Sequence, residues 1–165
     1  MTDARVTDAR VIDVRRDDPR SPAAAALIAE HHAFAQGEGD SAFRFVLGAE
    51  KLAATDTAFF TAWDGDALAG MGAVKRLDAD HAELKSMRTG DAHRRKGIAA
   101  AVLAALIAYA RDEGITRLSL ETGTGDRFIP AHALYRRFGF VDCGAFADYP
   151  ADSTQNRYMT LTLEA

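Results

Sequence analysis

The fold is decided by residues 81–122, HAELKSMRTGDAHRRKGIAAAVLAALIAYARDEGITRLSLET. Between Lys96 and Arg111 the apolar side chains recur on one helical face, which predicts an amphipathic helix that presents Ile98, Val102, Leu106 and Tyr109. Gly114 follows, at the position where helices favour glycine. The flanking segments 81–89 and 117–122 have the pattern of strands. A strand, a helix and a strand in this order predict a parallel pair joined by a crossover helix.

The rest of the chain adds antiparallel strands and further helices around this unit. The clearest hairpin signal is 58–63, the turn Asp64-Gly65-Asp66, and then 67–76. Ser21 can cap a helix that has Pro22 in its first position and extends toward Gly37. We also expect strands at 9–16, 140–146 and 156–163, and helices at 41–53 and 129–138. The predicted class is therefore α/β (α+β), with a mixed, mostly antiparallel sheet and flanking helices.

Size and composition fit one globular domain. A chain of 165 residues lies within the roughly 100–200 residues that one core commonly holds. With 48% hydrophobic and 27% charged residues, it has the composition of an ordinary folded protein. The repeated Thr-Asp-Ala-Arg at 2–5 and 7–10 gives little to bury, so we expect residues 1–8 to be frayed and residues 9–165 to form a single domain.

Charge and cysteine usage exclude several classes of function. The net charge of −4 argues against a general attraction to nucleic acid or to an anionic membrane. The single cysteine, Cys143, excludes an intrachain disulfide and a multi-cysteine zinc site. The sequence has neither a membrane-length apolar run nor the apolar core of a secretion signal. We therefore expect a cytoplasmic protein with no metal.

One stretch concentrates positive charge where the long helix begins. Arg88 is followed by 93–96, His-Arg-Arg-Lys, and then by Gly97. The first turn of a helix has unpaired N–H groups and the positive end of the dipole, so it binds phosphate well, and glycine allows close approach. A solvated basic surface is an equally open interpretation. Nucleic-acid binding is less favoured, because no aromatic residues are interleaved. The glycine pattern also differs from the ATP and NAD phosphate loops.

Three motifs in this region resemble those of the GNAT acetyltransferase superfamily. Residues 94–99, Arg-Arg-Lys-Gly-Ile-Ala, resemble its Gln/Arg-x-x-Gly-x-Gly/Ala motif. Residues 82–87 look like its fourth strand, and 133–140 resemble its Ala-Leu-Tyr-x-x-x-Gly-Phe motif. The resemblance implies a GNAT-like sheet with a splayed parallel strand pair. It further implies an N-acetyltransferase that moves acetyl from acetyl-CoA to a primary amine by direct attack in a ternary complex. The alternative is a non-catalytic acyl-CoA-binding sensor or interaction module.

The resemblance also implies which residues hold acetyl-CoA. The backbone of Met87 and Thr89 should pair with the pantetheine arm, as an added strand pairs with a sheet edge. The amides that open the helix should hold the pyrophosphate. The expected cofactor-binding residues are Met87, Arg88, Thr89, Arg94, Arg95, Lys96, Gly97, Ile98 and Ala99.

Two residues are candidates for catalysis by the same resemblance. Tyr135 matches a tyrosine that protonates or stabilises the departing thiolate, and a phenol of pKa near 10 is protonated at neutral pH. Glu83, fourteen residues before Gly97, matches a general base that would deprotonate the amine. A core tyrosine and a surface glutamate paired with a basic neighbour are the structural alternatives. The identity of the amine and a homodimer both stay open.

The sequence departs from the family in one place and carries a subgroup signature in another. Phe128 stands where many members have an asparagine that contacts the cofactor. Residues 120–123, Leu-Glu-Thr-Gly, and the later Tyr149-Pro150 look like a bacterial subgroup. By analogy of position, the acceptor site would be bordered by Asp126, Arg127 and Asp148. The adjacent His31 and His32 favour a polar surface or a pocket lining over a metal site.

Overall fold

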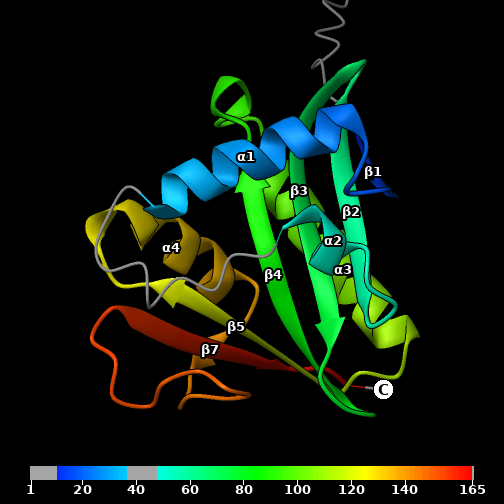
Figure 1. Cartoon of the computed structure of the whole chain (residues 1–165). Helices are drawn as coiled ribbons and strands as arrows, with labels where there is room; N and C mark the ends of the chain where they lie inside the picture. Colours follow the sequence, from blue (N-terminus) through cyan, green and yellow to red (C-terminus); the bar gives the residue numbers. More distant parts are fainter. Residues whose placement is uncertain (1–10, 37–47, 165) are drawn as a thin grey trace, which may run out of the picture.

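The computed structural model of the chain describes residues 11–36 and 48–164 (Figure 1). Its helices and strands are, in chain order, β1 (Ile12–Arg16), α1 (Pro22–Gln36), α2 (Ala49–Leu52), β2 (Thr57–Asp64), β3 (Ala67–Arg76), β4 (His81–Thr89), α3 (Ile98–Asp112), β5 (Arg117–Gly123), α4 (Ile129–Arg137), β6 (Val141–Asp142) and β7 (Asn156–Thr162). Short 3-10 helices lie at Asp91–His93 and Asp126–Phe128.

The strands form a mixed sheet in the order β1-β2-β3-β4-β5-β7-β6. All neighbouring pairs are antiparallel except β4 and β5, which are parallel and joined through α3. In Figure 1, α1 crosses one face of the sheet and α3 lies behind the other face. The α/β class and the mostly antiparallel sheet with one parallel pair are therefore confirmed.

The predicted elements agree with the structure except near β6. The hairpin pairs Asp64 with Ala67 across a two-residue turn, and β4 has the predicted bounds. The strand expected at 140–146 shrinks to Val141–Asp142, because the chain then leaves the sheet edge and forms a long loop before β7. The expectations for residues 1–8 and for the start of the helix at 41–53 lie outside the described residues; the described part of that helix is α2.

Helix α3 packs closely on the sheet because β3 offers glycine below it. A Cβ atom on Gly72 would lie 2.8 Å from Leu106 Cδ1 and 2.9 Å from Val102 Cγ1, which is too close for any larger residue. Leu103 and Leu106 are fully buried, and burial of each contributes about 1.5–3 kcal/mol. This packing fixes where the first turn of α3 lies relative to β4.

Helix α1 covers the opposite face of the sheet. The Ala24 amide donates a hydrogen bond to Ser21 Oγ at 3.3 Å, as the predicted cap requires. Leu27 and Ile28 pack in a second apolar cluster with Phe59 of β2 and with buried residues of β3 and α2. Because the buried side chains tie α1 to the sheet, its later residues are held beside the end of β4.

Candidate active site

A cavity of about 1210 Å³ lies where the parallel strands β4 and β5 separate. They pair only over His81–Leu84 of β4 and Arg117–Leu120 of β5. Beyond Leu84 a bulge shifts the pairing of β4 with β3, and Ser86 there has a φ of 57°. The two strands diverge in Figure 1, which leaves one edge of this part of β4 without a neighbouring strand among the described residues. An extended ligand can pair with such an edge.

The first turn of α3 opens into this cavity with unpaired amides. Gly97 is the N-cap residue with a φ of 77°, and no side chain of the described residues caps the helix. The Ala101 amide makes the first helical bond, to Gly97 O at 3.1 Å, so the amides before it have no partner within the helix. Arg95 also has a positive φ, 65°, which costs a non-glycine residue about 1–2 kcal/mol. Backbone strain of this kind concentrates at functional sites.

The expected cofactor-binding residues come together, with one exception. The cavity is lined by Met87, Arg88, Thr89, Arg94, Arg95, Gly97, Ile98 and Ala99. The side chain of Lys96 does not line it, because Nζ donates to Asp64 Oδ2 at 3.1 Å and lies 3.1 Å from His93 Nδ1. Lys96 therefore ties the loop before α3 to the end of β2.

Tyr135 of α4 lines the cavity near the split. Its ring packs edge-on against Phe140 at a centroid distance of 5.7 Å, and the residue is 7% exposed. Burial raises the pKa of Tyr135 above its usual value, and the charge of Glu121 adds to the effect. The phenol is therefore protonated at neutral pH and acts as a hydrogen-bond donor.

Glu83 is buried in a polar cluster at the base of the cavity. Its Oε2 accepts a hydrogen bond from Lys85 Nζ at 3.2 Å and another from the Tyr149 hydroxyl. Lys85 Nζ also donates to the Tyr149 hydroxyl at 2.8 Å. Burial, followed by the nearby charge of Glu83, raises the pKa of Tyr149. The lysine partner that the structural alternative required is present, but the pair lines the cavity instead of the protein surface.

A second carboxylate faces the same cavity. Glu121 of β5 accepts a hydrogen bond from Asn156 Nδ2 at 2.6 Å, and burial raises its pKa despite that bond. The charged residues of the lining are thus two carboxylates and a larger number of lysine and arginine side chains.

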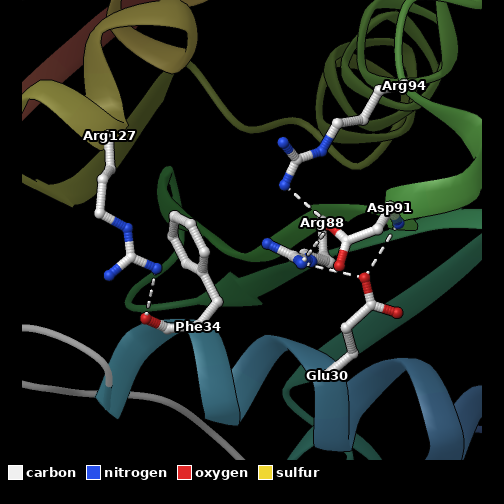
Figure 2. Close-up of polar contacts among 6 residues, drawn as sticks. All are labelled: Glu30, Phe34, Arg88, Asp91, Arg94 and Arg127. Carbon is white, nitrogen blue, oxygen red and sulfur yellow. Dashed lines mark hydrogen bonds and ion pairs between the residues drawn. The ribbon is translucent and has the colours of Figure 1, made fainter.

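The wall of the cavity on the α1 side is aromatic and cationic (Figure 2). The Phe34 ring lies between the guanidinium groups of Arg127 and Arg88, whose Cζ atoms are 3.9 and 4.8 Å from its centroid. Phe128 packs edge-on against Phe34 at 5.6 Å. His31 lines the same wall, where burial and then the charge of Arg88 lower its pKa to about 4. His31 is therefore neutral at physiological pH.

Sequence reasoning found part of this wall and missed the rest. Arg127 lines the cavity as expected, whereas Asp126 and Asp148 do not. Phe34 lies almost one hundred positions from Arg127 in the chain, and no local motif pointed to it. Tyr149 was recognised only as part of a subgroup signature, and its bond to Glu83 joins residues far apart in sequence.

Comparison with known proteins identifies the family. Residues 23–140 match the model of the acetyltransferase (GNAT) family. The chain belongs to the GNAT family. It is 41% identical over 149 residues to the uncharacterized N-acetyltransferase YedL of Escherichia coli, covering 90% of this chain and 93% of that one. It is 53% identical over 106 residues to the uncharacterized N-acetyltransferase YsnE of Bacillus subtilis, covering 64% and 70% of the two chains. The chain is thus a GNAT N-acetyltransferase.

Solved structures agree with this GNAT fold. A Klebsiella pneumoniae protein described as an acyl-CoA N-acyltransferase superposes with a TM-score of 0.77 at 26% identity, covering 94% of this chain and 99% of that one. A GNAT acetyltransferase of Elizabethkingia anophelis, solved with acetyl-CoA bound, gives a TM-score of 0.68 at 15% identity, covering 92% and 98%. This second likeness concerns the fold alone.

The GNAT family uses acetyl-CoA, and the cavity fits such a ligand. Its volume lies above the roughly 300–1,000 Å³ of ordinary small-molecule pockets. The unpaired amides at Gly97 suit a diphosphate. Within residues 11–36 and 48–164, no cluster of side chains could hold a metal ion, and no helix has the length and apolarity needed to cross a bilayer.

Proposed function

We propose that the protein transfers acetyl from acetyl-CoA directly to a primary amine while both substrates are bound. One observation carries the proposal: a single cavity brings together the unpaired amides of α3, the free edge of β4, Tyr135 and Glu83. A binding sensor would need the phosphate site, but it would have no use for a buried acid–base cluster at the other end of the cavity.

In this proposal, the backbone of β4 and of the first turn of α3 binds acetyl-CoA. The amides from Arg95 to Ala99 would hold the diphosphate, and the basic side chains of Arg94 and Arg95 would add charge. The edge of β4 at Met87 and Thr89 would pair with the pantetheine arm. Both groups belong to rigid elements, so the thioester is placed without further ordering.

Glu83 is proposed to take the proton of the acceptor. Its two hydrogen bonds, from Lys85 and Tyr149, both use Oε2, and Oε1 makes none within the part of the chain that the structure describes. Oε1 would therefore receive the proton, directly or through a water molecule. An ammonium acceptor must lose this proton before its nitrogen can attack.

Bound acetyl-CoA supplies the activated acetyl group: the amine nitrogen bonds to the acetyl carbon as the carbon–sulfur bond breaks. The nitrogen loses a second proton as the amide forms, and one proton ends on the sulfur. Tyr135 would donate a hydrogen bond to the sulfur as its charge develops. Because its pKa is raised, the Tyr135 phenol is better suited to donate a hydrogen bond than to give up its proton completely.

Two measurements test the proposal. Acetyl-CoA at about one hundred times its dissociation constant should add about 2.7 kcal/mol of stability, seen as a raised melting temperature. A panel of amines with thiol detection should then show release of coenzyme A. Glu83→Gln should lower kcat, and the loss should become smaller at high pH, where the acceptor is already a free amine. Glu113→Gln, an exposed change outside the cavity, serves as the control. An unmoved melting temperature would overturn the proposal.

A further inference from the structure

The α1 side of the cleft carries a second pair of arginines, one of which, Arg88, shares the acceptor Asp91 Oδ1 with Arg94. Arg94 and Arg95 lie at the start of α3, whereas Arg88 and Arg127 flank Phe34 on the α1 side. A positive ion over each side of one ring is held by cation–π attraction, which strengthens when the groups are removed from water. Figure 2 shows the three side chains side by side, with Arg88 pointing toward the ring. The wall therefore presents two guanidinium groups at fixed positions.

Arg88 has an unused donor in this wall. Its side chain is only 9% exposed, and its terminal nitrogen donates to Glu30 Oε1 at 2.9 Å and to Asp91 Oδ1 at 3.0 Å. Its Nε is buried and has no hydrogen-bond partner among residues 11–36 and 48–164. His31 Nδ1, on the same wall, is also buried and has no partner in the described part of the chain. Buried polar atoms nearly always form hydrogen bonds. Two buried nitrogen atoms without a bond beside one cavity therefore indicate that a polar group of a ligand binds between α1 and β4.

Acidic and basic side chains lie on different walls of the cleft, and this arrangement favours some acceptors over others. Glu83 and Glu121 lie on the splayed strands, where they would attract an ammonium group. The guanidinium of Arg127 would repel a second cation, which disfavours polyamines and lysine-rich peptides, whereas the charge of Arg88 is already met by Glu30 and Asp91. A guanidinium presents N–H donors in a fork that matches a carboxylate. The Phe34–Phe128 pair beside it offers an apolar surface.

We propose that this end of the cleft binds the carboxylate of the acceptor, so that the substrate is an amino acid with an apolar body. The amine would face Glu83, the carboxylate would face Arg127 and the Nε atom of Arg88, and the apolar part would rest on Phe34 and Phe128. The inference rests on the proposed function, because it names the substrate of that same site.

The test compares acceptors that differ only in the carboxylate. L-phenylalanine is paired with 2-phenylethylamine, and 6-aminohexanoate with hexylamine, so that α- and ω-amino acids are distinguished. With saturating acetyl-CoA, we expect that in one of the two pairs the acceptor with the carboxylate has a kcat/KM at least tenfold higher than the acceptor without it. Equal or better turnover of both carboxylate-free amines would overturn the inference and leave the acetyltransferase proposal intact.

Arg127→Met provides the second readout. It should raise KM at least tenfold for the carboxylate acceptor and leave KM for the matching amine and for acetyl-CoA nearly unchanged. Arg127→Lys keeps the positive charge but lacks the two parallel N–H donors of a guanidinium. Its KM for the carboxylate acceptor should lie between those of the wild type and Arg127→Met. Arg136→Met, on the exposed face of α4, is the matched control. Equal losses for both acceptors of a pair would assign Arg127 a structural role only, through its bond to Phe34 O at 3.0 Å, and overturn the inference.

The two proposals fail in different ways. If acetyl-CoA raises the melting temperature but no amino acid is acetylated, the carboxylate inference is wrong and the coenzyme site stands. If acetyl-CoA itself does not bind, the proposed function is wrong, and the inference about its acceptor falls with it.

Discussion

Gly97→Ala separates the role of the α3 amides in ligand binding from their role in the fold. Gly97 has a φ of 77°, and a Cβ atom built on it meets no atom of the described residues within 4 Å. Gly114, near the other end of the helix, has the same φ and the same open surroundings, but it does not line the cavity. The two substitutions therefore impose the same backbone strain, and only one of them touches the proposed phosphate site.

The size of the effect follows from this geometry. Alanine in the left-handed region costs about 1–2 kcal/mol, which in a domain of this size lowers the melting temperature by about 2–8 °C in either variant. At Gly97 the backbone can relieve this strain by turning its amides away from the ligand. Hydrogen bonds to charged groups are worth about 1.5–3 kcal/mol. The dissociation constant for acetyl-CoA should therefore rise about tenfold to a hundredfold.

Isothermal titration calorimetry with acetyl-CoA on both variants makes the comparison direct. Gly114→Ala should keep the wild-type dissociation constant within about twofold, since its melting loss is unrelated to the ligand. The reasoning would be refuted if both variants bound acetyl-CoA equally well, because the amides at the start of α3 would then not contact the coenzyme.

Two further predictions concern buried titratable groups. Tyr135→Phe should lower kcat about a hundredfold, as the loss of one transition-state donor does, with an unchanged calorimetric affinity for acetyl-CoA; a decrease of less than threefold would contradict this. His31 has a folded-state pKa of about 4 against an ordinary 6.5, so the unfolded chain binds more protons between these values. Its contribution to stability is therefore fully present above pH 6.5 and is lost as the pH falls toward 4. When the pH falls from 7 to 5, the free energy of unfolding measured with urea should decrease by about 2 kcal/mol because of His31. His31→Leu should remove that part of the pH dependence.

Much of the cofactor side of the site could be predicted from sequence, because its determinants are local. The amides that open α3 follow from a helix start and one glycine, and both lie within a few residues of each other. The parallel pair followed from the order of strand, helix and strand. The contact of Lys96 could not be predicted from the local sequence. Its ammonium group binds Asp64, which lies at the end of β2 and is distant from the basic run in sequence.

The acceptor side could not be predicted in the same way, because its residues come from distant segments. Tyr149 reaches Glu83 only because the strand expected at 140–146 ends early and the chain forms a loop that returns to the cleft. Phe34 meets Arg127 only because α1 is packed across the sheet beside the end of β4.

By itself, the sequence determined the class of the fold, the family and the helix start that suits a diphosphate, since periodicity and turn residues act over a few positions. Only the tertiary structure decided which side chains share the cavity: which carboxylate meets a tyrosine, and which arginines enclose Phe34. Contacts of this kind depend on how elements pack in space, and packing is set by the whole core rather than by any one segment.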